Sequence, residues 1–330
     1  MAARWVIVGA GAVGGTIGGG LVEGGAEVVL VARGAHGEAL RRDGLLLRDP
    51  DREVRLRIPT VAAPAEVDWR PDDVVILATK TQDAVAALDA VAAVAPDVPV
   101  VCATNGVEAE RMALRRFASV HGMCLWIPAQ HVEPGVVETS SAPVSGVLDV
   151  GRYPEGADDV DEALADALQA GRFVSRAVSD VMAAKRTKLL TNLGNVLDAA
   201  CGLDPGLGLI IKAARAEARA AFEAAGLPLV PKEEADARWG GHVQQRPIPG
   251  STWVGGSTAQ SLQRGARLET DYLNGEISLV GRLHGVPTPV NDGLQRLGRH
   301  LETAGVRPGS MSLAEVAAFA GVALDGDGAR

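Results

Sequence analysis

A glycine-rich segment near the N-terminus has the residue spacing that phosphate binding requires. It follows an apolar run at 5–8 and opens an Ala/Gly-rich segment that continues to residue 24, so it lies between a predicted strand and a predicted helix. The GxGxxG residues are Gly9, Ala10, Gly11, Ala12, Val13 and Gly14. Gly9 permits a tight turn, Gly11 lets backbone N–H groups approach a pyrophosphate, and Gly14 lets the helix lie close to the strand. We predict a dinucleotide site at this helix N-terminus; a glycine-rich packing turn is the alternative.

The residue that closes the second predicted strand, 27–32, indicates which dinucleotide binds. An Asp or Glu there would bind the ribose 2′-hydroxyl of NAD. This strand ends instead at Arg33, with no acidic residue. A guanidinium pairs with phosphate through two parallel hydrogen bonds, so Arg33 favours NADP over NAD. The alternative is a solvated surface arginine.

Two further predicted strands, 73–79 and 98–104, are followed directly by polar residues, Lys80 and Asn105. Ligands of doubly wound sheets bind at the carboxyl ends of the strands. Gly9, Arg33, Lys80 and Asn105 are therefore expected to face one crevice. Taken singly, Lys80 and Asn105 are equally well explained as residues that begin helices.

A group of polar residues occurs in the predicted helix over 180–200. Lys188, Asn192 and Asn195 are spaced i, i+4 and i+7, which places them on one face of a continuous helix. An ammonium and two carboxamides suit the wall of a polar cleft, where the lysine donates a proton and the amides hold a carbonyl or carboxylate. A solvated helix face is the alternative, and Lys185 is the rival lysine.

A third group contains Ser257 and, further along, Glu269 in the stretch LETDYLNG over 268–275. Each residue also has a structural explanation. Ser257 precedes Gln260 at the capping-box offset, and Glu269 is placed as an acid in the first turn of a helix.

Composition limits the function classes. The length of 330 residues suggests about two domains, and the net charge of −9 argues against nucleic acid or an anionic membrane as a partner. The three cysteines, at 102, 124 and 201, have neither CxxC nor metal spacing, which predicts a reduced, cytoplasmic compartment and no metal. The first strand begins almost at residue 1 and no apolar run has membrane length, so we expect no signal peptide and no membrane span.

The predicted elements define an α/β fold in two parts. Strands alternate with helices in the first half, with a short hairpin over 45–60 and β character over 121–150. We therefore expect a Rossmann-type, doubly wound parallel sheet over 1–178 that binds NADP, and an all-helical substrate and catalytic domain over 179–330. The predicted helices of the second part are 180–200, 207–225, 231–243, 254–264, 271–284, 289–303 and 312–323.

Together, these residues resemble the ketopantoate reductase (2-dehydropantoate 2-reductase) family over about residues 4–303. The motifs shared with many dehydrogenases are the GAGAVG run, Arg33, Ala78-Thr79-Lys80, Asn105-Gly106, and Lys188 with Asn192. The motifs typical of this family are Ser257 twelve residues ahead of Glu269, the ETDYLNG run, Gly285, and Pro287-Thr288-Pro289-Val290-Asn291.

The resemblance implies NADPH-dependent reduction of a 2-oxo acid, with 2-dehydropantoate as the leading substrate, in pantothenate biosynthesis. It implies an active site between the two domains and leaves a homodimer open. The implied roles are 2′-phosphate binding by Arg33 and Lys80, a place between nicotinamide ribose and substrate for Asn105, general acid for Lys188, substrate binding by Asn192 and Ser257, and coupling of cofactor, lysine and substrate by Glu269. Asn195 joins the substrate-binding set through the helical stripe.

Several positions depart from the family pattern, and all are on the substrate side or line the cleft. Val196 and Ser261 stand where an asparagine and an aspartate are expected, His131 and Trp126 are bulkier than expected, and the loop 201–208 lacks an asparagine. These departures keep two alternatives open. One is a paralogous reductase of another ketone or imine. The other is a non-catalytic NADP-binding sensor, against which the retained lysine and glutamate argue.

Overall fold

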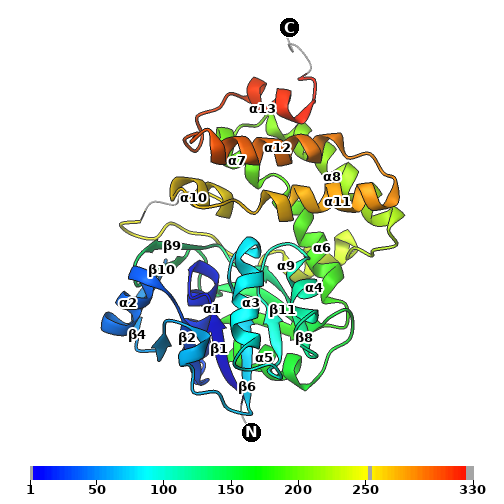
Figure 1. Cartoon of the computed structure of the whole chain (residues 1–330). Helices are drawn as coiled ribbons and strands as arrows, with labels where there is room; N and C mark the ends of the chain where they lie inside the picture. Colours follow the sequence, from blue (N-terminus) through cyan, green and yellow to red (C-terminus); the bar gives the residue numbers. More distant parts are fainter. Residues whose placement is uncertain (1–2, 252–254, 325–330) are drawn as a thin grey trace. The chain divides into compact units, whose positions relative to one another are not determined.

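The computed structural model describes residues 3–251 and 255–324. The chain divides into two compact units, each described here by itself (Figure 1). Unit 1 comprises Met1–Lys185 and Val230–Thr252, and unit 2 comprises Arg186–Leu229 and Trp253–Arg330. No helix among the described residues is long and apolar enough to cross a membrane.

Unit 1 is built on a sheet that has eight strands within the described residues, in the order β12-β11-β8-β7-β6-β1-β2-β5. The strands are β1 (Arg4–Val8), β2 (Val28–Val31), β5 (Thr60–Val61), β6 (Asp73–Leu77), β7 (Val100–Cys102), β8 (Val120–Trp126), β11 (Gly146–Arg152) and β12 (Phe173–Ala177). Neighbours pair in parallel except β8 with β11. The central strands are continuous apolar runs because both faces of a parallel sheet are covered.

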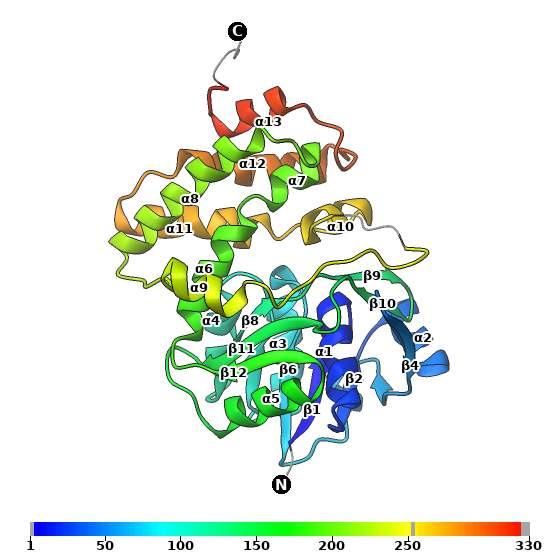
Figure 2. The same ribbon diagram turned by 180° about the vertical axis from the view of Figure 1, so that it is seen from behind.

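Helices cover both faces of this sheet. α1 (Ala12–Glu23) and α5 (Asp159–Ala170) bury Ile17 and Leu164 against one face, which is seen in Figure 2. α3 (Ala84–Ala92) and α4 (Ala109–Leu114) bury Leu88 and Ala113 against the other face, which is seen in Figure 1. The predicted doubly wound arrangement is confirmed.

A smaller sheet follows the second strand and its helix α2 (Gly34–Asp43). Its order is β4-β3-β10-β9, with β3 (Leu45–Asp49), β4 (Arg52–Leu56), β9 (Ala129–Glu133) and β10 (Val136–Thr139). The predicted hairpin over 45–60 is confirmed as antiparallel β3 and β4, but its last residue, Thr60, begins β5, which joins the large sheet. Two 3₁₀ turns, η1 (Pro64–Glu66) and η2 (Thr81–Asp83), complete the connections.

The segment Val230–Thr252, which the sequence places in the helical domain, clusters with unit 1. It contains α9 (Lys232–Trp239), whose last two residues bind Asp149 of β11: Arg238 Nε at 3.0 Å and Trp239 Nε1 at 3.1 Å. Gln245 then forms a β-bridge with Ser141. The two units divide at residues 185 and 186, whereas the expected boundary was 178. The segment over 230–252 is bound to unit 1 by residues distant in sequence, such as Asp149 and Ser141. A helical pattern in the sequence does not reveal such partners.

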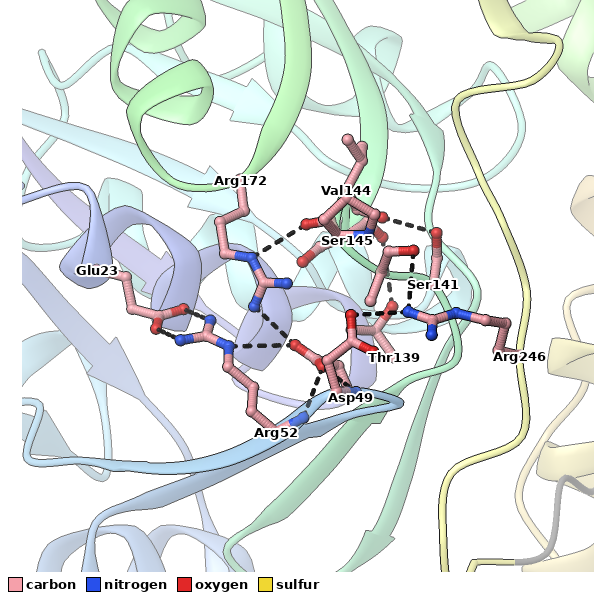
Figure 3. A network of polar contacts seen from close by, with 12 residues as sticks. Glu23, Asp49, Arg52, Thr139, Ser141, Val144, Ser145, Arg172 and Arg246 are labelled. Carbon is pink, nitrogen blue, oxygen red and sulfur yellow. Dashed lines mark hydrogen bonds and ion pairs between the residues drawn. The ribbon is translucent and has the colours of Figure 1, made fainter.

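Two carboxylates of the β3–β4 turn, buried Asp49 and exposed Asp51, connect three parts of unit 1 (Figure 3). Asp49 Oδ2 accepts a hydrogen bond from Arg172 Nη1 at 2.7 Å and from Arg52 Nε at 3.3 Å. Beside it, Arg246 Nη2 donates to Asp51 Oδ2 at 2.7 Å. The network joins the β3–β4 turn, the residue before β12 and the returning segment after α9.

All the regular secondary structure among the described residues of unit 2 is helical. α6 (Val181–Asn192) carries the chain into it, followed by α7 (Asn195–Cys201), α8 (Leu207–Ala224), α10 (Ser257–Gln263), η3 (Thr270–Tyr272), α11 (Asn274–His284), α12 (Pro289–Thr303) and α13 (Leu313–Ala320). Its core contains Leu193, Leu197, Ile210, Ile277 and Leu294, all with no exposed surface. The predicted helical domain is confirmed; residue 254, where the sequence begins one helix, lies outside the described residues.

Candidate active site

Four predicted cofactor-side residues lie at the carboxyl ends of four adjacent strands of unit 1. Gly9 follows β1, Arg33 follows β2, Lys80 follows β6 and Asn105 follows β7, and the strands stand in the order β7-β6-β1-β2. Thr81 Oγ1 donates to the Asn105 carbonyl at 3.2 Å, which links two of these loops. The structure thus brings the four residues to one edge of the sheet.

The glycine-rich turn has close packing on one side and space on the other. Gly9 has φ +99°, which favours glycine, and a Cβ at Gly14 would lie 2.0 Å from the Gly9 carbonyl oxygen and 3.0 Å from Ile7. A Cβ at Gly11 would meet nothing within 4 Å. α1 has no acidic residue in its first turn and no side-chain cap, so its positive end is available to an anion.

Arg33 is exposed, directly before α2. Its side chain makes no hydrogen bond or ion pair with another described residue, and no acid occupies the first turn of α2. A guanidinium in this position can bind a phosphate without first breaking an internal contact. Lys80 is half-buried and caps η2.

His36, which the sequence analysis missed, binds the backbone of the glycine-rich turn. The Gly135 N–H must donate to His36 Nδ1, at 2.9 Å, so the ring is neutral and its Nε2–H donates to the Ala10 carbonyl at 2.7 Å. His131 Nε2 lies 3.0 Å from the same Nδ1 and donates to it. Burial lowers the pKa of His36. No motif marks this residue, because its role depends on Gly135, 99 positions away.

Two other residues that depart from the family pattern, Trp126 and Ser261, contact residues within their own units. Trp126 stacks on Trp239 of α9, with ring centroids 5.5 Å apart, so its size serves packing within unit 1. Ser261 is buried, and its Oγ donates to the Ser257 carbonyl of its own helix at 3.0 Å.

The predicted lysine and first asparagine of unit 2 contact each other. Lys188 Nζ donates to Asn192 Oδ1 at 2.7 Å, and the lysine is half-buried. The prediction of one helix over 180–200 is wrong, because α6 ends at Asn192 and α7 begins at Asn195. Asn195 therefore does not continue the stripe of the other two residues. The turn between the helices is tightened: Leu197 N–H donates to the Gly194 carbonyl, three residues back, at 3.0 Å.

Asn195 lies instead beside the N-terminus of α10. A Cβ on Gly256 would be 4.0 Å from Asn195 Oδ1, and the Gly256 N–H donates to Asp198 at 3.3 Å. Gly256 is the N-cap and Ser257 the first helical residue, so the suggested capping box at Ser257 does not form. The structure thereby brings two predicted substrate ligands, Asn195 and Ser257, close together, while Val196 turns into the interior, 1% exposed.

The rival lysine and the predicted glutamate are both buried. Lys185 Nζ lies 2.5 Å from Glu110 Oε1 and donates to the Thr104 carbonyl at 2.9 Å, so its charge is neutralised within unit 1. Glu269 is 5% exposed and stands at the N-cap of η3 without making a side-chain cap. Helix capping therefore does not account for this carboxylate.

A buried histidine cluster lies at the opposite, amino end of β8. His121 donates from Nδ1 to Asp161 at 2.9 Å, and its Nε2 lies 3.0 Å from Ser119 Oγ. Asp161 also completes the capping box of α5 with Asp158. The cluster serves the start of this helix and stands apart from the strand ends that carry the predicted site.

Comparison with known proteins agrees with this architecture. Residues 5–155 match the family "Ketopantoate reductase PanE/ApbA", and residues 180–302 match "Ketopantoate reductase PanE/ApbA C terminal". The 2-dehydropantoate 2-reductase of Pyrococcus horikoshii is 25% identical over 309 residues, which cover 91% of this chain and 97% of that protein.

Solved structures with the same fold include a PanE/ApbA family ketopantoate reductase from Ralstonia eutropha. It has 27% identity and a TM-score of 0.77, and the match covers 92% of this chain and 99% of that one. A D-mandelate dehydrogenase, solved with NADH and anilino(oxo)acetate, has 23% identity and a TM-score of 0.76, with the same coverage. From both family matches and these relatives, the chain belongs to the ketopantoate reductase family and is an oxidoreductase acting on CH–OH groups.

Proposed function

We propose that this protein reduces a 2-oxo acid with NADPH, and that 2-dehydropantoate is the substrate. The observation that carries the proposal is the Lys188–Asn192 pair, a half-buried ammonium held at 2.7 Å by a carboxamide, in a member of this family. Such a pair presents a proton donor in a fixed direction, as reduction of a ketone requires.

NADPH is favoured over NADH by the end of β2. Arg33 is exposed, its guanidinium has no partner among the described residues, and it follows the strand where an acid would select NAD. The D-mandelate dehydrogenase neighbour was solved with NADH, so the fold by itself does not exclude NADH, and we assign the choice of cofactor to the side chains after β2. Lys80, from the loop after β6, adds a second positive charge toward the 2′-phosphate.

Bound NADPH would supply a hydride to the ketone carbon. Lys188 holds a proton at Nζ and transfers it to the carbonyl oxygen as negative charge develops there, which gives the 2-hydroxy acid and a neutral amine. Asn192 keeps the ammonium oriented. Asn105, Asn195 and Ser257 orient the substrate, and the Glu269 carboxylate favours the charged lysine.

The substrate is tested by steady-state turnover of 2-dehydropantoate beside a straight-chain apolar 2-oxo acid of similar size. A preference for 2-dehydropantoate that disappears in Asn195→Ala supports the proposal. Val196 and Ser261 favour the second candidate, a paralogous reductase of another ketone or imine, because both side chains face inward where the family has polar groups. A preference for the apolar acid that Asn195→Ala leaves unchanged would select that candidate. NADPH binding without turnover of either acid would favour the sensor.

A further inference from the structure

We infer that Asn274 and Asn291 are positioning residues that fix the break between α6 and α7 and thereby aim Asn192 and Asn195 in different directions. The inference rests on the proposed function, in which these two asparagines face the substrate. Asn274 belongs to the ETDYLNG run, of which the mechanism uses only Glu269, and Asn291 belongs to the PTPVN run, which the mechanism does not use.

The break leaves the buried backbone carbonyl of Leu193 without its helical donor. In a continuous helix the Leu193 carbonyl would accept from the Leu197 N–H. Here Leu197 and Asp198 both donate to the Gly194 carbonyl, at 3.0 and 3.1 Å. Asn274 Nδ2 donates a hydrogen bond to the Leu193 carbonyl at 3.1 Å, in place of the Leu197 N–H. Because an unsatisfied buried carbonyl costs about 1–3 kcal/mol, this contact favours the broken form over the continuous one.

Asn274 is itself held by a chain of hydrogen bonds that leads away from the break. Its Nδ2 also donates to Asn291 Oδ1 at 3.1 Å, which uses both hydrogens of the amide. Asn291 Nδ2 donates to Glu217 at 2.8 Å and to the Ala214 carbonyl at 3.0 Å, so the Asn291 amide can have only one orientation. Asn274 is 1% exposed and Asn291 has no exposed surface.

Glu217 anchors the far end of this chain. Its two oxygens accept the backbone N–H groups of Val290 and Asn291, at 2.8 and 3.0 Å, where α12 begins. A carboxylate at a helix N-terminus is favoured by the helix dipole. These hydrogen bonds therefore connect α8 through α12 and α11 to the break between α6 and α7. An apolar side chain of the same size could not replace Asn274 or Asn291, because it would leave backbone carbonyls without a hydrogen-bond donor.

The break determines where Asn195 points. In an uninterrupted helix Asn195 would lie roughly 20° from the direction of Lys188. With the break in place, Asn195 lies beside the N-terminus of α10, where Ser257 is the first helical residue. Asn192 still accepts the hydrogen bond from Lys188. Two different faces of the substrate can then be held from one short segment.

The test compares Asn274→Ala with Ser278→Ala. Ser278 is a matched control one turn along α11, because it is also fully buried and its Oγ has no described hydrogen-bond partner. Amide hydrogen exchange at 194–198 in the ligand-free protein should accelerate at least tenfold in Asn274→Ala and not in the control. This readout needs no substrate, so it decides the structural claim even if 2-dehydropantoate is not turned over. Unchanged exchange in Asn274→Ala would overturn the inference.

Kinetics then test the link to substrate. Asn274→Ala should raise KM for the 2-oxo acid about three- to tenfold, the value of one hydrogen bond, with NADPH affinity unchanged. In an Asn195→Ala background it should add little, because it acts through that residue. Fully additive effects, or faster exchange with an unchanged KM, would overturn the positioning role. Glu217→Gln, at the partly exposed end of the chain, provides a milder variant with the same predicted direction if Asn274→Ala does not fold.

Discussion

Replacing each lysine of α6 in turn should separate catalysis from stability. Lys188→Ala removes the proposed proton donor and should lower turnover by about two to four orders of magnitude. Because Lys188 is half-buried, water can replace part of its contacts, and the free energy of unfolding should change little, by about 1 kcal/mol or less. NADPH affinity should be retained.

Lys185→Ala should have the opposite effect. The side chains of Lys185 and Glu110 are 2% and 0% exposed, so the substitution leaves a carboxylate buried without its cation. Breaking such a pair costs about 3–5 kcal/mol. For a unit of roughly 200 residues this corresponds to a fall in Tm of about 6–20 °C. Turnover per folded molecule, measured well below that Tm, should stay within a few fold of the unsubstituted protein.

The decisive control removes both charges together. Lys185→Met with Glu110→Leu replaces the buried pair by apolar side chains of similar length, which should recover most of the lost Tm. Thermal melting followed by circular dichroism and steady-state turnover with NADPH provide the two readouts. Loss of turnover in the Lys185→Met, Glu110→Leu double variant at restored Tm, with turnover retained in Lys188→Ala, would refute the assignment of the general acid.

Three further predictions concern unit 1. Arg33→Ala should weaken NADPH binding at least tenfold and leave NADH binding almost unchanged in calorimetric titrations, since a charge-assisted contact is worth about 1.5–3 kcal/mol; equal losses for both cofactors would remove the role in 2′-phosphate binding. Burial lowers the pKa of His36 from its usual value of 6.5. As the pH falls below 6.5, the unfolded chain therefore binds a proton that the folded protein does not bind. The free energy of unfolding decreases with falling pH until the pKa of His36 in the folded protein is passed. His36→Gln keeps a donor for Ala10 and should lack this part of the pH dependence; identical pH slopes in denaturant titrations would contradict the assignment. Asp49→Ala should lower the free energy of unfolding by about 1.5–3 kcal/mol, and a loss below 0.5 kcal/mol would show that solvent replaces its contact with Arg172.

The sequence by itself determined the nucleotide-binding half of the fold and the places where its strands end. The reason is that these signals are local. Gly9 needs a positive φ that other residues rarely adopt, and Gly14 has no room for a Cβ, so the turn is written in the residues that form it. Continuous apolar runs identified the buried parallel strands, and the residues after them, such as Arg33 and Asn105, then followed from topology.

Only the tertiary structure decided how the residues that we propose to contact the substrate are arranged. Helical spacing placed Asn195 on the face of Lys188, but Asn274, 81 residues from Leu193, satisfies the Leu193 carbonyl at a break that periodicity does not predict. Spacing also left Lys185 and Lys188 as rival candidates for the proton donor. The structure distinguishes them, because Lys185 forms an ion pair with the buried Glu110. The physical reason is the same in both cases: a helical pattern specifies which residues share a face, whereas the partners of buried polar groups come from segments distant in the chain.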